Sequence, residues 1–394
     1  MKRASLKTGI LNVLLLCVAM LVAFTSAEAL SRYLRPLSTV GYQMDADVGP
    51  LLEPKQTSRW VNEDYDVVVR TNSAGFHDSE HPIEKPSNRY RILVLGDSYI
   101  EALQVPVEKG FTQQLERRLS EQVKAKEVEV INLGVSGSGP AQYYRILEMK
   151  GLLYEPDLVV MAIFPGNDFW DSDPALSGAV FKPYYVIRSD EVLEYRPPST
   201  KGVGSALRPW LRRSALLHLV RQAIASLPIE RWLASMGLLA PAGGIKGKHV
   251  SIPLGWSVYL REPPQDWLDT EKLTIRMIRE ASVLSKSRGA AFLAMVIGSV
   301  SAVENRWEEA LAPYPTARSV AWDFSRPVSL IQELGWQAQF DVIDLTEPFR
   351  SDFLATGQSS SWPHDGHWNE RGHRLGAEVV SSYLVEHGQK YRLQ

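Results

Sequence analysis

Only one cysteine, Cys17, occurs among the 394 residues. A single cysteine excludes an intrachain disulfide framework, and no cluster of cysteine and histidine offers a structural zinc site. The chain also lacks a charge excess, because 43 Lys and Arg residues stand against 45 Asp and Glu residues. Proteins with a general affinity for nucleic acid carry a basic excess, so we expect no nucleic-acid partner.

Long hydrophobic runs are equally scarce. One run lies near the N-terminus and no second run of comparable length follows, which excludes a multi-pass membrane protein. A composition of 45% hydrophobic and 22% charged residues excludes a disordered, collagen-like or mainly coiled-coil chain. The length predicts one large domain with insertions, or two domains.

The N-terminal run extends over residues 10–30 and follows three basic residues. An uncleaved membrane anchor and a cleaved signal peptide ending at Ala27-Glu28-Ala29 both fit this pattern. We favour the anchor, because about 20 apolar residues suffice to cross the hydrocarbon layer. Basic residues before the run favour a cytoplasmic N-terminus. The sequence therefore predicts a single-pass protein of the inner membrane whose remaining chain is periplasmic.

Apolar, β-rich segments alternate with amphipathic helical segments from residue 89 onward. Continuous apolar strands between helices are typical of a parallel sheet covered on both faces, so we predict an α/β fold. The expected strands are 89–95, 128–133, 157–163, 291–297 and 340–345. The expected helices are 111–123, 141–152, 269–287 and 370–386.

Three segments are predicted along the chain. Residues 1–31 form the anchor or signal, residues 32–88 a membrane-proximal segment, and residues 89–394 the α/β domain. Residues 172–264 interrupt the alternation with many prolines and glycines, and we interpret them as an insertion between the third and fourth strands.

Two positions could carry nucleophilic chemistry. Ser98 directly follows the first buried strand, and in open α/β sheets the carboxyl ends of strands carry the site. His367 precedes the last helix, with Asp365 two residues earlier, a spacing that suits a general base and its orienting carboxylate. Two alternatives remain open: Ser98 as an ordinary helix cap, and a metal cluster formed by His364, Asp365, His367 and His373.

Four short blocks resemble those of the SGNH hydrolases, also called the GDSL esterase and lipase family, in the same order. The resemblance implies a three-layer α/β/α, flavodoxin-like fold with Ser98 as nucleophile and His367 as base. It also implies that the backbone N–H groups of Ser98 and Gly137 and the side chain of Asn167 form the oxyanion hole. The blocks are Leu95–Tyr99, Asn132–Gly137, Gly166–Asp168 and His367–Asn369; upstream, Arg70–Phe76 resembles membrane-anchored bacterial members.

One position departs from the family pattern. The family usually places its aspartate three residues before the histidine, and His364 stands there in this chain. Asp365 lies two residues before His367, an arrangement similar to that of alginate-pathway O-acetylation proteins. We predict that Asp365 orients His367, with a backbone carbonyl as the alternative.

Together these features predict a serine esterase that cleaves an acyl ester, most plausibly an O-acetyl group on a glycan outside the cytoplasm. No metal or organic cofactor is implied. An O-acetyltransferase on the same residues, supplied by a membrane acyl-donor protein, is one alternative. A non-catalytic glycan-binding or assembly protein is the other.

Overall fold

A computed structural model describes residues 2–34, 38–177, 182–198, 214, 216, 252–312 and 314–393. The chain divides into two compact units, residues 1–39 with 201–241 and residues 40–200 with 242–394. Most of the predicted insertion, including residues 217–251, lies outside the described residues.

The first unit contains helix α1 (Lys2–Leu34). Its stretch Leu14–Tyr33 has a mean hydropathy of 2.0 and is long enough to cross a membrane. Leu14, Leu16 and Leu21 are each more than half exposed, so their apolar side chains are not covered by the protein itself. A helix of this length and composition occurs in membrane anchors and in signal sequences alike.

The second unit is built on a five-stranded sheet, counted over the described residues. Every neighbouring pair of strands is parallel, and the order is β11-β10-β7-β5-β6. The first strand therefore lies second from one edge, as in flavodoxin-like folds, and the predicted α/β class is confirmed. The strands are β5 (Arg89–Gly96), β6 (Glu127–Gly134), β7 (Leu158–Ile163), β10 (Ala291–Val296) and β11 (Asp341–Asp344).

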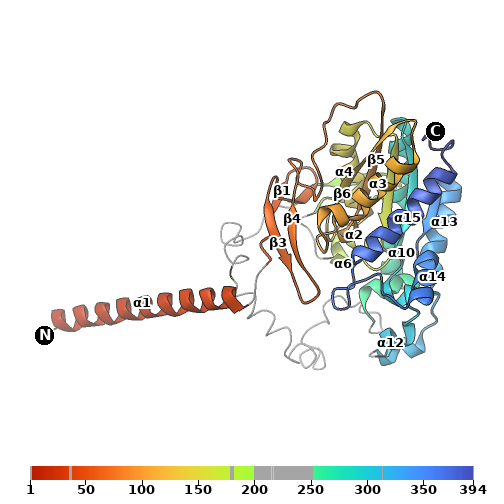
Figure 1. Ribbon diagram of the computed structural model, residues 1–394. Helices are drawn as coiled ribbons and strands as arrows, with labels where there is room; N and C mark the ends of the chain where they lie inside the picture. Colours follow the sequence, from red (N-terminus) through yellow and green to blue (C-terminus); the bar gives the residue numbers. More distant parts are fainter. Residues whose placement is uncertain are drawn as a thin grey trace. The chain divides into compact units, whose positions relative to one another are not determined.

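Helices cover both faces of this sheet (Figure 1), and successive strand residues point to opposite faces. On β5, Ile92 and Val94 pack with α3, α14 and α15, whereas Leu93 and Leu95 pack with α4, α10 and α13. These two apolar layers form the core of the unit. The helices are α3 (Phe111–Gln122), α4 (Pro140–Met149), α10 (Gln265–Ser287), α13 (Arg326–Ala338), α14 (Thr346–Thr356) and α15 (Glu370–Glu386).

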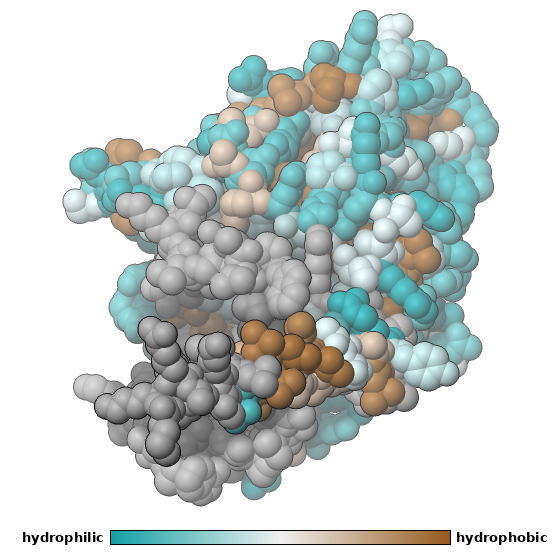
Figure 2. All heavy atoms as spheres, turned by 90° about the vertical axis from the view of Figure 1, so that its left-hand side faces the viewer, coloured by the Kyte–Doolittle hydropathy of each residue, from teal (hydrophilic) through white to brown (hydrophobic). Residues whose placement is uncertain are grey.

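Short elements connect these layers. Short helices are α2 (Ser98–Glu101), α5 (Asp168–Asp171), α6 (Pro174–Ser177), α11 (Val300–Val303) and α12 (Trp307–Leu311). Turns of 3-10 helix are η1 (Val107–Lys109), η2 (Gly151–Tyr154), η3 (Leu254–Tyr259) and η4 (Pro315–Ser319). Strands β8 (Tyr184–Ile187) and β9 (Leu193–Arg196) pair as an antiparallel hairpin within the predicted insertion. On the face drawn in Figure 2, hydrophilic side chains predominate among the coloured residues.

Two further antiparallel hairpins precede the sheet. The first joins β1 (Tyr42–Asp45) to β2 (Gly49–Leu52), and the second joins β3 (Thr57–Val61) to β4 (Asp66–Arg70). Residues 40–88 of the predicted membrane-proximal segment lie in the same compact unit as the sheet. The connection between the strands of the second hairpin contacts the loop that carries Asp365.

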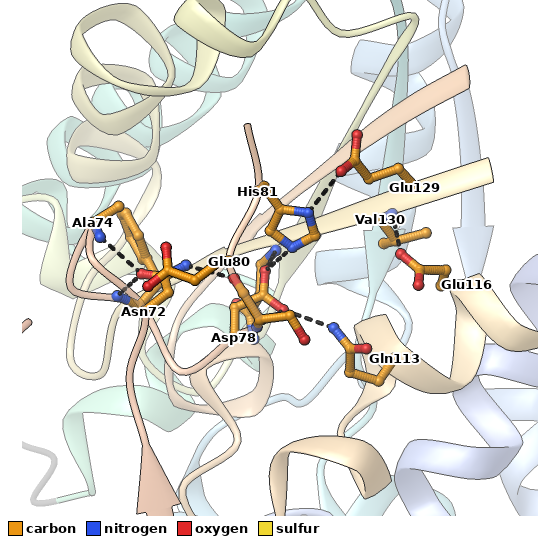
Figure 3. Close-up of polar contacts among 12 residues, drawn as sticks. Asn72, Ala74, Asp78, Glu80, His81, Gln113, Glu116, Glu129 and Val130 are labelled. Atoms are coloured by element: carbon orange, nitrogen blue, oxygen red, sulfur yellow. Dashed lines mark hydrogen bonds and ion pairs between the residues drawn. The ribbon is translucent and has the colours of Figure 1, made fainter. Parts of the chain in front are cut away.

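A buried polar cluster lies at the amino ends of β5 and β6, the edge opposite to Ser98. His81 contacts Glu129 through Nδ1 at 2.9 Å and Asp78 through Nε2 at 3.1 Å (Figure 3). The Arg91 guanidinium also donates to Glu129, at 2.5 Å, and Asp78 accepts the backbone N–H of Asn132 at 2.7 Å. The cluster ties the segment before β5 to the sheet.

This cluster predicts a pH-dependent stability. Burial alone would lower the pKa of His81, but Asp78 and Glu129 outweigh it and raise the pKa to about 9. The stabilisation is therefore fully present below the ordinary histidine pKa of 6.5 and is lost as pH rises through about 9. The difference between the two pKa values corresponds to roughly 3 kcal/mol of unfolding free energy.

Denaturant unfolding at a series of pH values measures this effect. We expect the free energy of unfolding to decline between pH 6.5 and about 9 in the wild type and in the control His387→Gln. The decline should be much smaller in His81→Gln. Equal declines in all three proteins would contradict the assignment.

Candidate active site

Ser98 lies where β5 ends and α2 begins. Asp97 caps α2, and its side chain accepts the N–H of Tyr99 at 2.9 Å, which starts the helix at Ser98. The helix passes so close to β6 that a Cβ on Gly134 would lie 2.3 Å from the backbone nitrogen of Glu101. Glycine at position 134 therefore allows α2 to hold Ser98 at the carboxyl edge of the sheet.

Ser98, His367 and Asp365 form one hydrogen-bonded row, although 269 residues separate the serine from the histidine. Ser98 Oγ lies 2.7 Å from His367 Nε2, and His367 Nδ1 contacts Asp365 Oδ1. An ionised carboxylate only accepts hydrogen bonds, so the imidazole hydrogen belongs on Nδ1, and Nε2 is free to accept from the serine. This arrangement can move a proton from Ser98 to His367.

Aromatic packing holds the loop that carries His367. The neighbouring Trp368 is 2% exposed and packs against Tyr99 and Phe349 at ring-centroid distances of 5.4 and 5.2 Å. Asn369 then caps α15 by accepting the N–H groups of Arg371 and Gly372. The packing of Trp368 and the helix cap formed by Asn369 therefore fix the backbone that carries His367.

His367 and Asp365 shift each other's pKa, each toward its charged form. Burial alone would lower the pKa of His367, but the hydrogen bond and the negative charge of Asp365 outweigh it and raise the pKa above its ordinary value. Burial would raise the pKa of Asp365, yet hydrogen bonds from His367 and Tyr65 lower it overall. Asp365 is therefore ionised at neutral pH, as an orienting carboxylate must be.

The two other predicted oxyanion donors lie on the loops after β6 and β7. Gly137 has a φ of +66°, a conformation that favours glycine, and its carbonyl accepts from Lys182. Asn167 Nδ2 donates to Asp97 at 3.0 Å and to Asp171 at 3.1 Å. Both Nδ2 hydrogens of Asn167 therefore point to carboxylates, and one of them must turn to the substrate if Asn167 is to stabilise an oxyanion. Oxyanion stabilisation by Asn167 and Gly137 stays a prediction.

The histidines considered for a metal cluster have different surroundings. His364 is 67% exposed at its side chain and contacts Asp64. His373 is 1% exposed and packs edge-on against Trp368. Within the described part of the chain, no group of three or more His, Cys, Asp or Glu residues could hold a metal ion.

Sequence reasoning missed the residues that hold Asp365. Tyr65 and Asn62, between β3 and β4, donate to its Oδ2 at 2.7 and 3.3 Å. Asp64, in the same loop, accepts the N–H of Asp365 at 2.8 Å. No spacing pattern links residues 300 positions apart, so only the folded chain could reveal these contacts.

Comparisons with solved structures give distant matches. A scan against family models and a search of curated proteins find no match. Among solved structures, the acetyl xylan esterase AlAXEase is 15% identical, covers 75% of this chain and 99% of its own, and has a TM-score of 0.39. A lipase/acylhydrolase from Enterococcus faecalis is 15% identical, with coverages of 76% and 96% and a TM-score of 0.37.

A mutant acetylxylan esterase from Geobacillus stearothermophilus is 11% identical, with coverages of 74% and 92% and a TM-score of 0.38. The names of all three proteins describe ester hydrolases, the class that the sequence blocks resemble.

Proposed function

We propose that this protein is a serine esterase in which Ser98 is the nucleophile, His367 the general base and Asp365 the orienting carboxylate. The main support for this proposal is the pair of contacts that links Ser98 Oγ to His367 Nε2 and His367 Nδ1 to Asp365 Oδ1. A serine hydroxyl is a weak nucleophile until a neighbouring base takes its proton, and His367 Nε2 lies at the distance such a transfer needs.

The proposed reaction has two halves. Ser98 Oγ attacks the ester carbonyl while its proton moves to His367, and collapse of the tetrahedral intermediate transfers that proton to the departing alcohol. Water then loses a proton to His367 and attacks the acyl-serine, which releases the carboxylic acid and restores Ser98. The N–H groups of Ser98 and Gly137 and the amide of Asn167 are the proposed donors to the oxyanion.

The proposed substrate is an O-acetyl ester on a glycan. This choice follows from the resemblance of the sequence blocks to SGNH hydrolases and from the Asp-x-His spacing at Asp365. The apolar stretch Leu14–Tyr33 supports export of the sheet-containing unit, with an inner-membrane anchor as the proposed form. A membrane acyl-donor protein is a partner only if acetyl groups are transferred to sugar.

Hydrolysis of a chromogenic acetyl ester by the full chain in detergent tests the proposal. We expect turnover that depends on Ser98 and releases acetate when acetylated oligosaccharides replace the chromogenic ester. Acetylated sugar formed from added oligosaccharide would identify a transferase instead. Turnover unchanged in Ser98→Ala would exclude the proposed nucleophile.

The pH dependence of turnover provides a second test. Catalysis needs neutral His367, so the rate should rise with pH through the raised pKa of this group, with a midpoint above 6.5. In Asp365→Asn, the residual rate should have its midpoint at lower pH, because the charge that raises the pKa is gone. The control Asp341→Asn, at the amino end of β11, should keep the wild-type midpoint.

A further inference from the structure

The connection between β3 and β4 contacts the candidate site. We call residues Asn62–Tyr65 the hairpin tip. The side chains of the hairpin tip form five hydrogen bonds with His364 and Asp365, two loop residues near the opposite end of the sequence. Asn62 also shapes the tip itself, because its Oδ1 accepts the N–H groups of Asp64 and Tyr65 at 2.8 and 3.1 Å. The tip is therefore a folded turn with its polar side chains set in place.

Tyr65 fixes the free oxygen of the orienting carboxylate. Its hydroxyl accepts from Trp60 Nε1 at 3.1 Å, and an indole nitrogen can only donate. The hydroxyl proton is therefore available to Asp365 Oδ2, 2.7 Å away. Tyr65 is 8% exposed and its ring packs against that of Trp362 at a centroid distance of 5.6 Å, which holds the ring in place.

Asp64 fixes the backbone of the same loop. Its Oδ2 accepts the N–H groups of His364 and Asp365 at 2.9 and 2.8 Å, and its Oδ1 contacts His364 Nδ1 at 2.7 Å. The Asp64 side chain is only 3% exposed, whereas the His364 side chain that it contacts is 67% exposed. His364 occupies the position where the SGNH family usually has its aspartate, and here its imidazole faces Asp64.

The loop needs such support for a physical reason. Gly366, between Asp365 and His367, has a φ of +81°, and a Cβ added there would meet nothing within 4 Å. Gly366 itself is held by its N–H bond to the Trp362 carbonyl at 2.9 Å and by the Tyr99 hydroxyl, which donates to its carbonyl at 3.3 Å, but neither bond reaches the Asp365 side chain. Asp365 uses Oδ1 for His367, and its half-buried Oδ2 would lose charge-assisted hydrogen bonds if the tip moved away.

We propose that the hairpin tip is a positioning element of the active site, in which Tyr65 and Asp64 hold Asp365 so that it orients His367. This inference rests on the proposed esterase function and assigns part of that function to the β3–β4 hairpin. The continuous row is then Trp60, Tyr65, Asp365, His367 and Ser98.

A double-mutant cycle tests the role of Tyr65. Tyr65→Phe in the full chain should lower kcat about tenfold with little change in KM, because the ring stays and only the hydroxyl is lost. In the Asp365→Asn background the same change should have almost no effect. Tyr90→Phe, which removes a hydroxyl bonded to the Tyr391 carbonyl at the other edge of the sheet, is the matched control and should keep wild-type kcat.

Asp64→Ala tests the backbone contacts, with Asp66→Ala as the control on the same hairpin. Asp66 pairs with Arg59 at an exposed site and makes no contact with the loop at 364–365 among the described hydrogen bonds. We expect a loss of kcat only in Asp64→Ala. Melting temperatures of all variants are measured in parallel. If Asp64→Ala fails to fold, the kcat of Tyr65→Phe decides whether the hairpin tip positions Asp365.

The far-downfield proton resonance of His367 Nδ1–H provides a readout that does not need turnover. It should shift or broaden in Tyr65→Phe and Asp64→Ala and stay unchanged in both controls. Ser98-dependent turnover with unchanged kcat and unchanged resonance in the tip variants would overturn the positioning role alone. Turnover that does not depend on Ser98 would overturn the proposed function, and the resonance would still decide whether the tip holds Asp365.

Discussion

Ser98→Ala should abolish ester hydrolysis while the protein stays folded. The change removes the oxygen that attacks the carbonyl and leaves His367 without a proton to accept. Loss of a triad nucleophile lowers kcat by a factor on the order of 10⁶ in serine hydrolases. The fold should tolerate the change, because Ser98 Oγ contributes one hydrogen bond, to His367, and such a bond is worth about 1 kcal/mol.

The measurement compares chromogenic ester turnover and thermal unfolding of the full chain with those of wild type. Ser287→Ala is a suitable control, since Ser287 lies in the last turn of α10 and bonds the Leu284 carbonyl. We expect wild-type turnover in the control and wild-type melting in both variants. Turnover of Ser98→Ala within a factor of about ten of wild type would contradict covalent catalysis at this residue.

His367→Ala should cost more activity than Asp365→Asn. Without the imidazole no group in the row can take the serine proton, and we expect kcat to fall by a factor on the order of 10⁶. Asparagine at 365 leaves the imidazole in place and loses the carboxylate charge and the favoured tautomer. The corresponding loss should be on the order of 10⁴.

This order of effects separates the base from its orienting partner. Turnover of both variants is measured on the high-pH plateau of the wild-type rate profile, where His367 is neutral, so that protonation does not mask the comparison. His387→Gln, at the C-terminal end of α15, serves as the histidine control. A larger loss in Asp365→Asn than in His367→Ala would contradict the assigned roles and would point to Asp365 as the group that contacts substrate.

Much of the fold could be predicted from local patterns. The strand expected at 89–95 is observed at Arg89–Gly96, and the helix expected at 370–386 is observed at Glu370–Glu386. Continuous apolar strands can be recognised in the sequence because both faces of such a strand are buried. Helices can be recognised by apolar residues at four-residue steps, because one face packs on the core. Helices α13 and α14 were not predicted, although α13 places its buried residues Ile331 and Leu334 at helical spacing.

The sequence by itself determined the parallel α/β class and the candidates Ser98, His367 and Asp365. Each candidate borders a strand or helix whose pattern is local, and parallel strands bring their carboxyl ends to one edge. Only the tertiary structure decided that these three side chains are in hydrogen-bond contact, and that Tyr65 and Asp64 hold the carboxylate. Such contacts join residues about 300 positions apart, and their geometry is set by how whole layers pack rather than by any neighbouring residue.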